Sequence, residues 1–337
     1  MIGTEKARAF FEQAAQRFAE RDAQTSVYSI GGGNVRIRAT SGFDFVHRAL
    51  AYLRCDKPTP VDLEIFAWHN AAGGTEMPSP PWSTDDYGPR GEIAGCNDAR
   101  FATAFDHAGS SLSMFDRATR RAIFWTRDTS ALPQADYGAP LKTILHWWAE
   151  SIDRVFLHGG GVGNERGAVL LAGTGGSGKS TSALYSAASG LHYLGDDYCM
   201  VDLEQPPALY SCYGTGKLAE QADLEFKNCA PAEEAKALFY VNENPAMKMS
   251  AALPLLAIFV PQIERTATRT TIVPTTPSEA LKALAPSTIS QLPGAGAATF
   301  QRLAKLVRMV PSYRLLLARD VDAIGDTIRA FLEQRAA

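Results

Sequence analysis

The first 150 residues alternate between two hydrophobic periods. Apolar side chains at steps of three and four predict an amphipathic helix over residues 4–21. Alternating positions predict two strands, 26–30 and 35–39, joined as a hairpin by the glycines 31–33. The same reasoning predicts these further elements: a helix over 43–53, a strand over 61–68, a Pro- and Gly-rich surface loop between Gly73 and Gly91, a strand over 122–126, and a helix over 141–150 whose Trp147 and Trp148 form a buried face. We therefore expect an α+β N-terminal domain over residues 1–150.

From residue 151 onward the rhythm changes to apolar strands, loops and helices. The run Ala168–Ala172 is continuously apolar, as in a strand buried on both faces. Pro261 is expected to end the strand that starts at Leu255, and Thr276 is expected to cap a helix with Glu279. The other predicted elements are strands at 155–157, 192–194 and 313–317, and helices at 179–189, 300–310 and 321–331. This mixture predicts an α/β domain over residues 151–337.

A glycine-rich loop follows the buried strand. The residues 173–180, Gly-Thr-Gly-Gly-Ser-Gly-Lys-Ser, fit the P-loop pattern of a Gly, four residues and Gly-Lys-Ser. Small residues let successive amides point into one concavity, and the following helix adds its positive dipole end. Lys179 places a charge on the outer phosphates, and the Ser180 hydroxyl can bind Mg²⁺. We predict that the loop binds a nucleoside triphosphate through these residues: Gly175, Gly176, Ser177, Gly178, Lys179, Ser180 and Thr181.

Two acidic residues and a histidine stand where nearby strands end. Asp196 and Asp197 follow the strand after the P-loop helix, and this path can return them to the carboxyl edge of the sheet. One carboxylate could hold Mg²⁺ while the other accepts a proton from an attacking hydroxyl. His158 ends the strand before the loop, and a structural role is as consistent with its position as a catalytic one.

Composition narrows the choice of partners. The net charge is −3, and the sequence has no basic run that would steer it to nucleic acid or to a membrane. It also has no long apolar stretch or signal-peptide pattern. The five cysteines are odd in number and include no Cys-x-x-Cys pair, which favours free thiols in a reducing cytoplasm. The sequence leaves open whether the protein forms a homo-oligomer.

The order His158-Gly159, P-loop at Gly173, then Asp196-Asp197 resembles the kinase core of the HPr kinase/phosphorylase family, whose core fold is similar to that of phosphoenolpyruvate carboxykinase. The resemblance is specific over about residues 155–202 and does not include the first 150. Over more of the chain the sequence is similar to HPr kinase-like proteins of bacterial peptide-modification clusters, including lasso-peptide precursor kinases. The segments that carry this second likeness are residues 213–218, Tyr-Gly-Thr-Gly-Lys-Leu, and 286–288, Pro-Ser-Thr.

The resemblance implies a role for each matched residue. Asp196 corresponds to the aspartate that removes the hydroxyl proton, and His158 to the histidine that contacts and tunes that aspartate. Asp197 and Ser180 correspond to the Mg²⁺ ligands. The arginine-containing glycine-rich signature of the HPr enzyme is missing here, and Lys217 stands in a comparable place as a catalytic cation. This departure argues against HPr as the substrate and against reverse phosphorolysis.

The sequence therefore predicts a Mg-ATP-dependent kinase whose acceptor is a hydroxyl, with a serine of a peptide or protein as the first expectation. A kinase of a small-molecule alcohol is one alternative. A nucleotide-binding regulator with little turnover is the alternative from another class.

Overall fold

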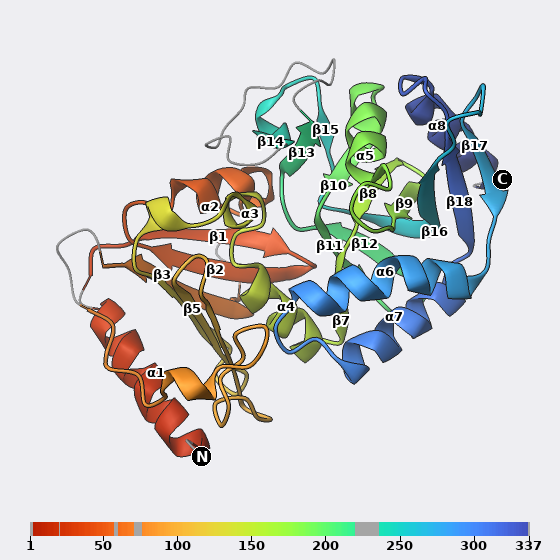
Figure 1. Cartoon of the computed structure of the whole chain (residues 1–337). Coiled ribbons are helices and arrows are strands. Elements are labelled where there is room, and N and C mark those ends of the chain that lie inside the picture. The colour runs from red at the N-terminus through yellow and green to blue at the C-terminus, as the bar shows by residue number, and fades with distance from the viewer. Residues whose placement is uncertain (1–2, 20, 57–59, 71–75, 220–235, 336–337) are drawn as a thin grey trace.

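Two sheets divide the chain into two lobes (Figure 1). This computed structural model describes residues 3–19, 21–56, 60–70, 76–219 and 236–335. The predicted loop residues Gly73 and Gly74, and Cys229, lie outside these ranges. No helix in the described part of the chain is long and apolar enough to cross a membrane.

The N-terminal lobe is built on a six-stranded mixed sheet. Its strands, in spatial order, are β1 (Gln24–Ile30), β2 (Gly33–Ala39), β3 (Leu63–His69), β6 (Arg121–Thr126), β5 (Ser111–Asp116) and β4 (Phe101–Asp106). Helix α1 (Thr4–Ala19) packs Phe11 and Phe18 on one face of the sheet. The opposite face is covered by α2 (Asp44–Ala49) and α4 (Lys142–Ser151), whose Trp147 and Trp148 are buried as expected.

Short elements connect this framework. Gly31 and Gly32 have positive φ angles of 53° and 75°, which suits the tight turn between β1 and β2. The predicted helix over 43–53 ends early, at Ala49, and continues as a 3₁₀ turn, η1 (Ala51–Leu53). The remaining short helices of this lobe are η2 (Thr84–Asp86), η3 (Thr129–Ala131) and α3 (Gln134–Gly138).

The second lobe contains a ten-stranded mixed sheet. Its main path runs in this spatial order: β15 (Lys248–Met249), β10 (His192–Gly195), β8 (Gly160–Asn164), β9 (Gly167–Leu171), β16 (Ala252–Ile263), β12 (Ala208–Ser211), β11 (Tyr198–Asp202) and β7 (Arg154–His158). Beside this path, β18 (Ser312–Leu317) pairs with β16 and with β17 (Thr271–Pro274). A separate hairpin-like pair is formed by β13 (Thr215–Ala219) and β14 (Lys236–Tyr240), and the 3₁₀ turn η4 (Val241–Glu243) follows.

Helices cover both faces of this second sheet, which confirms the predicted α/β character (Figure 1). Helices α5 (Lys179–Ala188) and α8 (Ala323–Arg335) share one apolar layer with the sheet. Helices α6 (Pro277–Gln291) and α7 (Ala297–Met309) form the layer on the other face. The predicted cap is present, because the Thr276 hydroxyl oxygen accepts the Glu279 amide at 3.2 Å.

The prediction that Pro261 ends its strand is wrong. Strand β16 continues to Ile263 because the ladder to β18 does not need the missing amide. The amides of Ile258 and Glu264 both bond to carbonyls on the β18 side, so in the alternating pattern the nitrogen of Pro261 faces the other side. There β9 has already ended, at Leu171, and proline is tolerated where no ladder partner remains.

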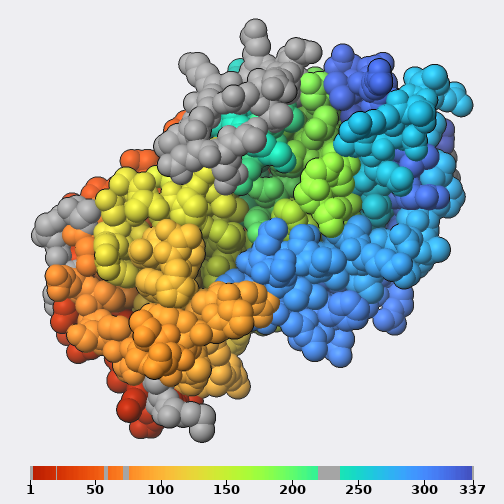
Figure 2. All heavy atoms as spheres, viewed as in Figure 1, coloured from red at the N-terminus to blue at the C-terminus, as the bar shows by residue number. Residues whose placement is uncertain are grey.

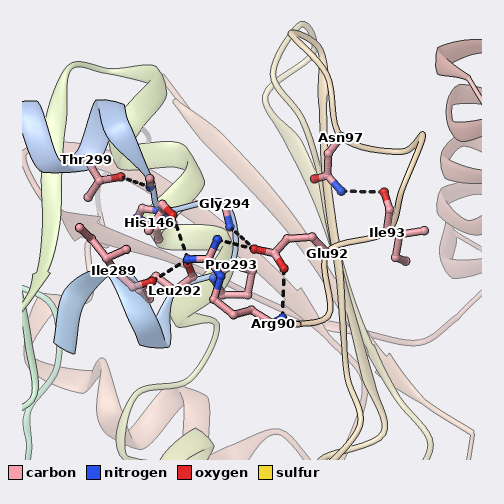
Figure 3. A network of polar contacts seen from close by, with 12 residues as sticks. Arg90, Glu92, Ile93, Asn97, His146, Ile289, Leu292, Pro293, Gly294 and Thr299 are labelled. Carbon is pink, nitrogen blue, oxygen red and sulfur yellow. Dashed lines mark hydrogen bonds and ion pairs between the residues drawn. The ribbon is translucent and has the colours of Figure 1, made fainter. Parts of the chain in front are cut away.

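An arginine from the N-terminal lobe anchors the end of α6 (Figure 3). Arg90 donates to three carbonyl oxygens, those of Ile289 at 2.6 Å, Leu292 at 3.1 Å and Ala295 at 2.8 Å. Glu92 pairs with Arg90 at 2.7 Å and accepts the Gly294 amide at 3.0 Å. A cation on the last carbonyls of a helix satisfies groups that have no partner within it. The two lobes are therefore joined by specific polar contacts as well as by a shared apolar core.

Candidate functional site

The P-loop connects β9 to α5, as the sequence predicts. Gly176 and Gly178 have φ angles of 80° and 100°, in the left-handed region that favours glycine. A side chain at Gly173 would collide with the Ser177 hydroxyl, so the base of the loop is tightly closed. A side chain at Gly175 or Gly176 would meet nothing within 4 Å, so the tip of the loop is open. This open tip gives an anion direct access to backbone amides.

Lys179 begins α5 and is fixed against the loop. Its Nζ donates to the carbonyl oxygens of Gly173 at 2.7 Å and Thr174 at 3.3 Å. Burial lowers the pKa of Lys179, while the charges of Asp196 and Asp197 oppose that shift. Ser180 and Thr181 are half-buried in the first turn of the helix, where the dipole attracts anions.

Sheet topology brings the two aspartates to the same edge as the P-loop. Strand β8 is antiparallel to both β9 and β10, so these two strands run in the same direction and end at the same edge. Asp196 follows β10 and is only 2% exposed. Its Oδ2 accepts the Lys217 amide at 2.9 Å, while Oδ1 has no hydrogen-bond partner in the described chain. Both carboxylates lie near enough to Lys179 for their charges to oppose the lowering of its pKa, so this segment lies beside the phosphate loop.

The surroundings of Asp196 favour its protonated form. Burial raises the pKa of Asp196 to about 6, and the neighbouring charge of Asp197 adds to the rise. The Lys217 amide, the nearby Ser180 hydroxyl and the Lys179 ammonium oppose it. A carboxylate that titrates near neutral pH is a better proton acceptor than an ordinary one.

His158 lies beside Asp197 and not beside Asp196, which corrects the expectation from the sequence. Its Nε2 is 3.9 Å from Asp197 Oδ1, and among the described residues no ion pair links it to Asp196. The reason is strand register, because His158 is paired with Tyr198 across β7 and β11, and the Gly159 amide bonds to the Asp197 carbonyl. Burial and the Lys179 charge lower the pKa of His158 to about 4, with Asp197 opposing, so the imidazole is neutral near pH 7.

Lys217 approaches the site from β13. Its Nζ lies 3.3 Å from Asp197 Oδ2, so the cation faces the second aspartate while its own backbone amide binds the first. The side chain also packs against Gly138 of α3, where an added Cβ would lie 3.2 Å from Lys217 Cε. The structure thus places Lys217 in the predicted site and connects it to the N-terminal lobe.

Ser180 and Asp197 fit a Mg-nucleotide better than a free metal ion. Within the described residues, no group of three or more His, Cys, Asp or Glu side chains is arranged to hold a metal. Mg²⁺ in nucleotide sites usually takes one or two carboxylates and completes its shell with phosphate oxygens and water. The Asp197 carboxylate and the Ser180 hydroxyl, which acts on the adjacent Asp196, match that requirement.

Three further residues border the site, and sequence reasoning assigned them no role. The His158 amide donates to Thr288 Oγ1 at 3.0 Å, and the Tyr198 ring contacts the His158 ring edge-on at 5.4 Å between centroids. The Tyr198 hydroxyl in turn donates to Gln291 Oε1 at 2.7 Å. The segment 286–288 signalled Thr288 by its family likeness alone, whereas no local pattern points to Tyr198 or Gln291.

Comparisons with known proteins add little to this geometry. No protein-family model matches the chain, and a search of curated proteins gives no match either. The solved structure of the Hpr(Ser) kinase/phosphatase from Coxiella burnetii is similar with a TM-score of 0.33 and 10% sequence identity, over 54% of this chain and 99% of that chain. Likeness at this level supports no functional assignment.

Proposed function

We propose that the protein is a Mg-ATP-dependent kinase that transfers the γ-phosphoryl group to a hydroxyl, with a serine of a peptide or protein as acceptor. The observation that carries this proposal is the meeting, at one sheet edge, of an open P-loop and a buried aspartate whose pKa is raised to about 6. A site that only binds nucleotide needs the loop but has no use for a buried proton acceptor.

Each residue of the site has a separate role in the proposed phosphoryl transfer. The loop amides and Lys179 hold the phosphates, and Lys217 supplies a second positive charge near the reacting groups. Asp196 accepts the hydroxyl proton as the hydroxyl oxygen forms a bond to the γ-phosphorus. The bond from that phosphorus to the bridging oxygen breaks, and ADP leaves with the electron pair. Mg²⁺, held by Ser180 and Asp197, would neutralise charge on the phosphate oxygens.

A peptide acceptor is supported by the two segments that resemble proteins of peptide-modification clusters. The first, residues 213–218, provides Lys217, and its Tyr213 and Thr215 hydroxyls bond to N-terminal-lobe carbonyls, that of Tyr213 at 2.9 Å. The second, residues 286–288, provides the Thr288 contact to His158. Both segments therefore contribute residues that contact the proposed active site.

The experiment is a binding and transfer assay with Lys179→Ala and a matched control, Lys282→Ala, on the exposed face of α6. Loss of the charged phosphate contact should weaken ATP binding by about 1.5–3 kcal/mol, while the control binds normally. Wild-type protein incubated with labelled ATP and the peptides encoded beside its gene should label a serine-containing peptide. Unchanged ATP affinity in the Lys179 variant would refute the site.

A further inference from the structure

The segment of residues 213–217 bonds to the N-terminal lobe at one end and to the transfer site at the other. It leads into the β13–β14 pair, which lies between α3 and α5 (Figure 1). On the face shown in Figure 2, the orange and yellow N-terminal lobe packs directly against the green and blue second lobe. Every residue of the segment is buried except Lys217, which is half-buried.

The start of the segment is bonded to the N-terminal lobe at three consecutive residues. The bonds run from the Tyr213 hydroxyl to the Pro140 carbonyl at 2.9 Å, from the Gly214 amide to the Ala49 carbonyl at 2.7 Å, and from the Thr215 hydroxyl to the Gly138 carbonyl. Gly138 is the last residue of α3, where a carbonyl has no partner within its own helix. The Thr215 hydroxyl therefore supplies a bond that the end of α3 needs.

The end of the segment is bonded to the strand that leads to Asp196. The Lys217 amide donates to Asp196 Oδ2 at 2.9 Å. The buried Tyr193 hydroxyl, on β10, donates to the Thr215 carbonyl at 2.6 Å. Thr215 thus bonds to both sides, with its hydroxyl on the N-terminal lobe and its carbonyl on β10.

These contacts determine how the Asp196 carboxylate is aimed. A proton acceptor must lie within hydrogen-bond reach of the hydroxyl that it deprotonates. The Lys217 amide holds Oδ2 and so sets the direction of the unpartnered Oδ1. A backbone amide moves with its strand, whereas the Lys217 ammonium ends a flexible side chain and can follow Asp197. A shift of β13 would therefore act mainly on Asp196.

We propose that Thr215 is a positioning residue, whose bond to the end of α3 fixes β13 so that the Lys217 amide aims Asp196 at the acceptor. This inference rests on the proposed kinase function. It gives the N-terminal lobe a role in the geometry of the proton acceptor.

The test removes the Thr215 hydroxyl at nearly constant shape. Thr215→Val lacks the donor, and Thr215→Ser keeps it. Thr103→Val is the matched control, because Thr103 is also a buried strand residue, on β4, and donates its hydroxyl to the Cys96 carbonyl at 3.0 Å. The acceptor is the best-labelled peptide from a synthetic pool, each member with one serine, incubated with labelled ATP.

Thr215→Val should lower kcat by about tenfold, since a misplacement of about 1 Å can cost a catalysed step about 10²-fold. Its ATP affinity should stay within about twofold of the wild type, because the P-loop contacts do not involve β13. Thr215→Ser and Thr103→Val should keep wild-type kcat. Wild-type kcat in Thr215→Val, or an equal loss in Thr103→Val, would overturn the proposal.

A double-mutant cycle tests whether Thr215 acts through Asp196. In an Asp196→Asn background no proton acceptor remains to be aimed, so adding Thr215→Val should lower the residual rate by less than about threefold. A tenfold loss in both backgrounds would contradict the positioning role.

Hydrogen exchange separates this inference from the proposed function. The Lys217 amide should exchange about tenfold faster in Thr215→Val and at the wild-type rate in Thr103→Val. If the wild type labels a peptide but this exchange is unchanged in Thr215→Val, the positioning role fails and the kinase proposal stands. If the wild type binds ATP and labels no peptide, the peptide-kinase proposal fails and the catalytic role of Thr215 fails with it.

Discussion

Each lobe buries an aspartate at a strand end, and the surroundings shift the pKa values of these two carboxyl groups in opposite directions. Asp116 in the N-terminal lobe is 0% exposed and receives both Arg100 nitrogens, at 2.9 and 2.7 Å, the Thr119 hydroxyl at 3.0 Å and the Ala118 amide at 3.0 Å. Burial alone would raise its pKa, but these donors outweigh it and the pKa is lowered. Asp196 accepts the Lys217 amide and leaves Oδ1 unpartnered in the described chain, and its pKa is raised.

This difference separates a carboxylate that is stabilised in its charged form from one that is not. A buried carboxylate with every oxygen satisfied stabilises the fold in its charged form. A buried carboxylate with an open oxygen beside a second negative charge is ready to accept a proton. The same substitution, aspartate to asparagine, should therefore have opposite consequences at the two positions.

The largest expected effect is on phosphoryl transfer. Asp196→Asn should lower the transfer rate by about 10³-fold, because an amide cannot take the hydroxyl proton, and ATP affinity should stay within about twofold. Calorimetry beside a transfer assay measures both quantities. A variant that keeps its biological effect together with ATP binding would instead favour the nucleotide-binding regulator.

The next effect is on the stability of the N-terminal lobe. Asp116→Asn should lower the free energy of unfolding by about 3 kcal/mol, because the amide nitrogen opposes an Arg100 donor and leaves a partly buried charge unpaired. Urea unfolding at pH 7 gives the value. Asp326→Asn, in an exposed pair with Arg329, is the control and should change stability by less than about 0.5 kcal/mol. Equal losses in the two variants would contradict a special role for Asp116.

A smaller effect of opposite sign is expected when Asp196→Asn is measured by unfolding. The raised pKa means that the folded state holds the Asp196 proton more tightly than the unfolded chain does. Wild-type stability should therefore fall as the pH rises from about 4 to about 6, by about 2 kcal/mol in total. The asparagine variant has no carboxylate charge to bury at this position, so it should be more stable than the wild type above pH 6. A variant less stable than wild type at pH 7.5, without nucleotide, would contradict the raised pKa.

The sequence could predict features formed by residues close together along the chain, but not contacts between residues far apart in it. The P-loop was predictable because its eight residues are contiguous, and the return of Asp196 required only one helix and one short strand. The pairing of His158 with Asp197 depends on the antiparallel register of β7 and β11, which no local pattern encodes. The contact between Arg90 and the Ile289 carbonyl, which anchors α6, joins residues 199 positions apart. Strand β16 continues through Pro261 because its amides point alternately to the two neighbouring strands. Long-range register and lobe packing therefore account for what the sequence could not predict.

The smallest expected effect concerns His158, a neutral side chain beside Asp197. Burial lowers its pKa to about 4, so the imidazole is neutral at working pH, and its Nε2 lies 3.9 Å from Asp197 Oδ1, too far for a direct hydrogen bond. We expect this outer contact to limit the movement of Asp197, the proposed Mg²⁺ ligand. Loss of an outer contact to a metal-binding carboxylate typically costs activity 10–100-fold, and His158→Ala should be at the mild end, with turnover lowered about tenfold and ATP affinity unchanged.

The pH dependence distinguishes positioning from charge. In the wild type, kcat/KM should fall as the pH drops through about 6, because Asp196 then becomes protonated. His158→Ala should keep this acidic limb within about half a pH unit, since no charge is removed above pH 5. His192→Ala is the matched control, because His192 on β10 bonds to Ser250 at 2.6 Å and faces Glu165, away from both aspartates. An acidic limb displaced by a full unit or more in His158→Ala would mean that the imidazole is charged in the working enzyme, and wild-type turnover would mean that His158 only closes its strand.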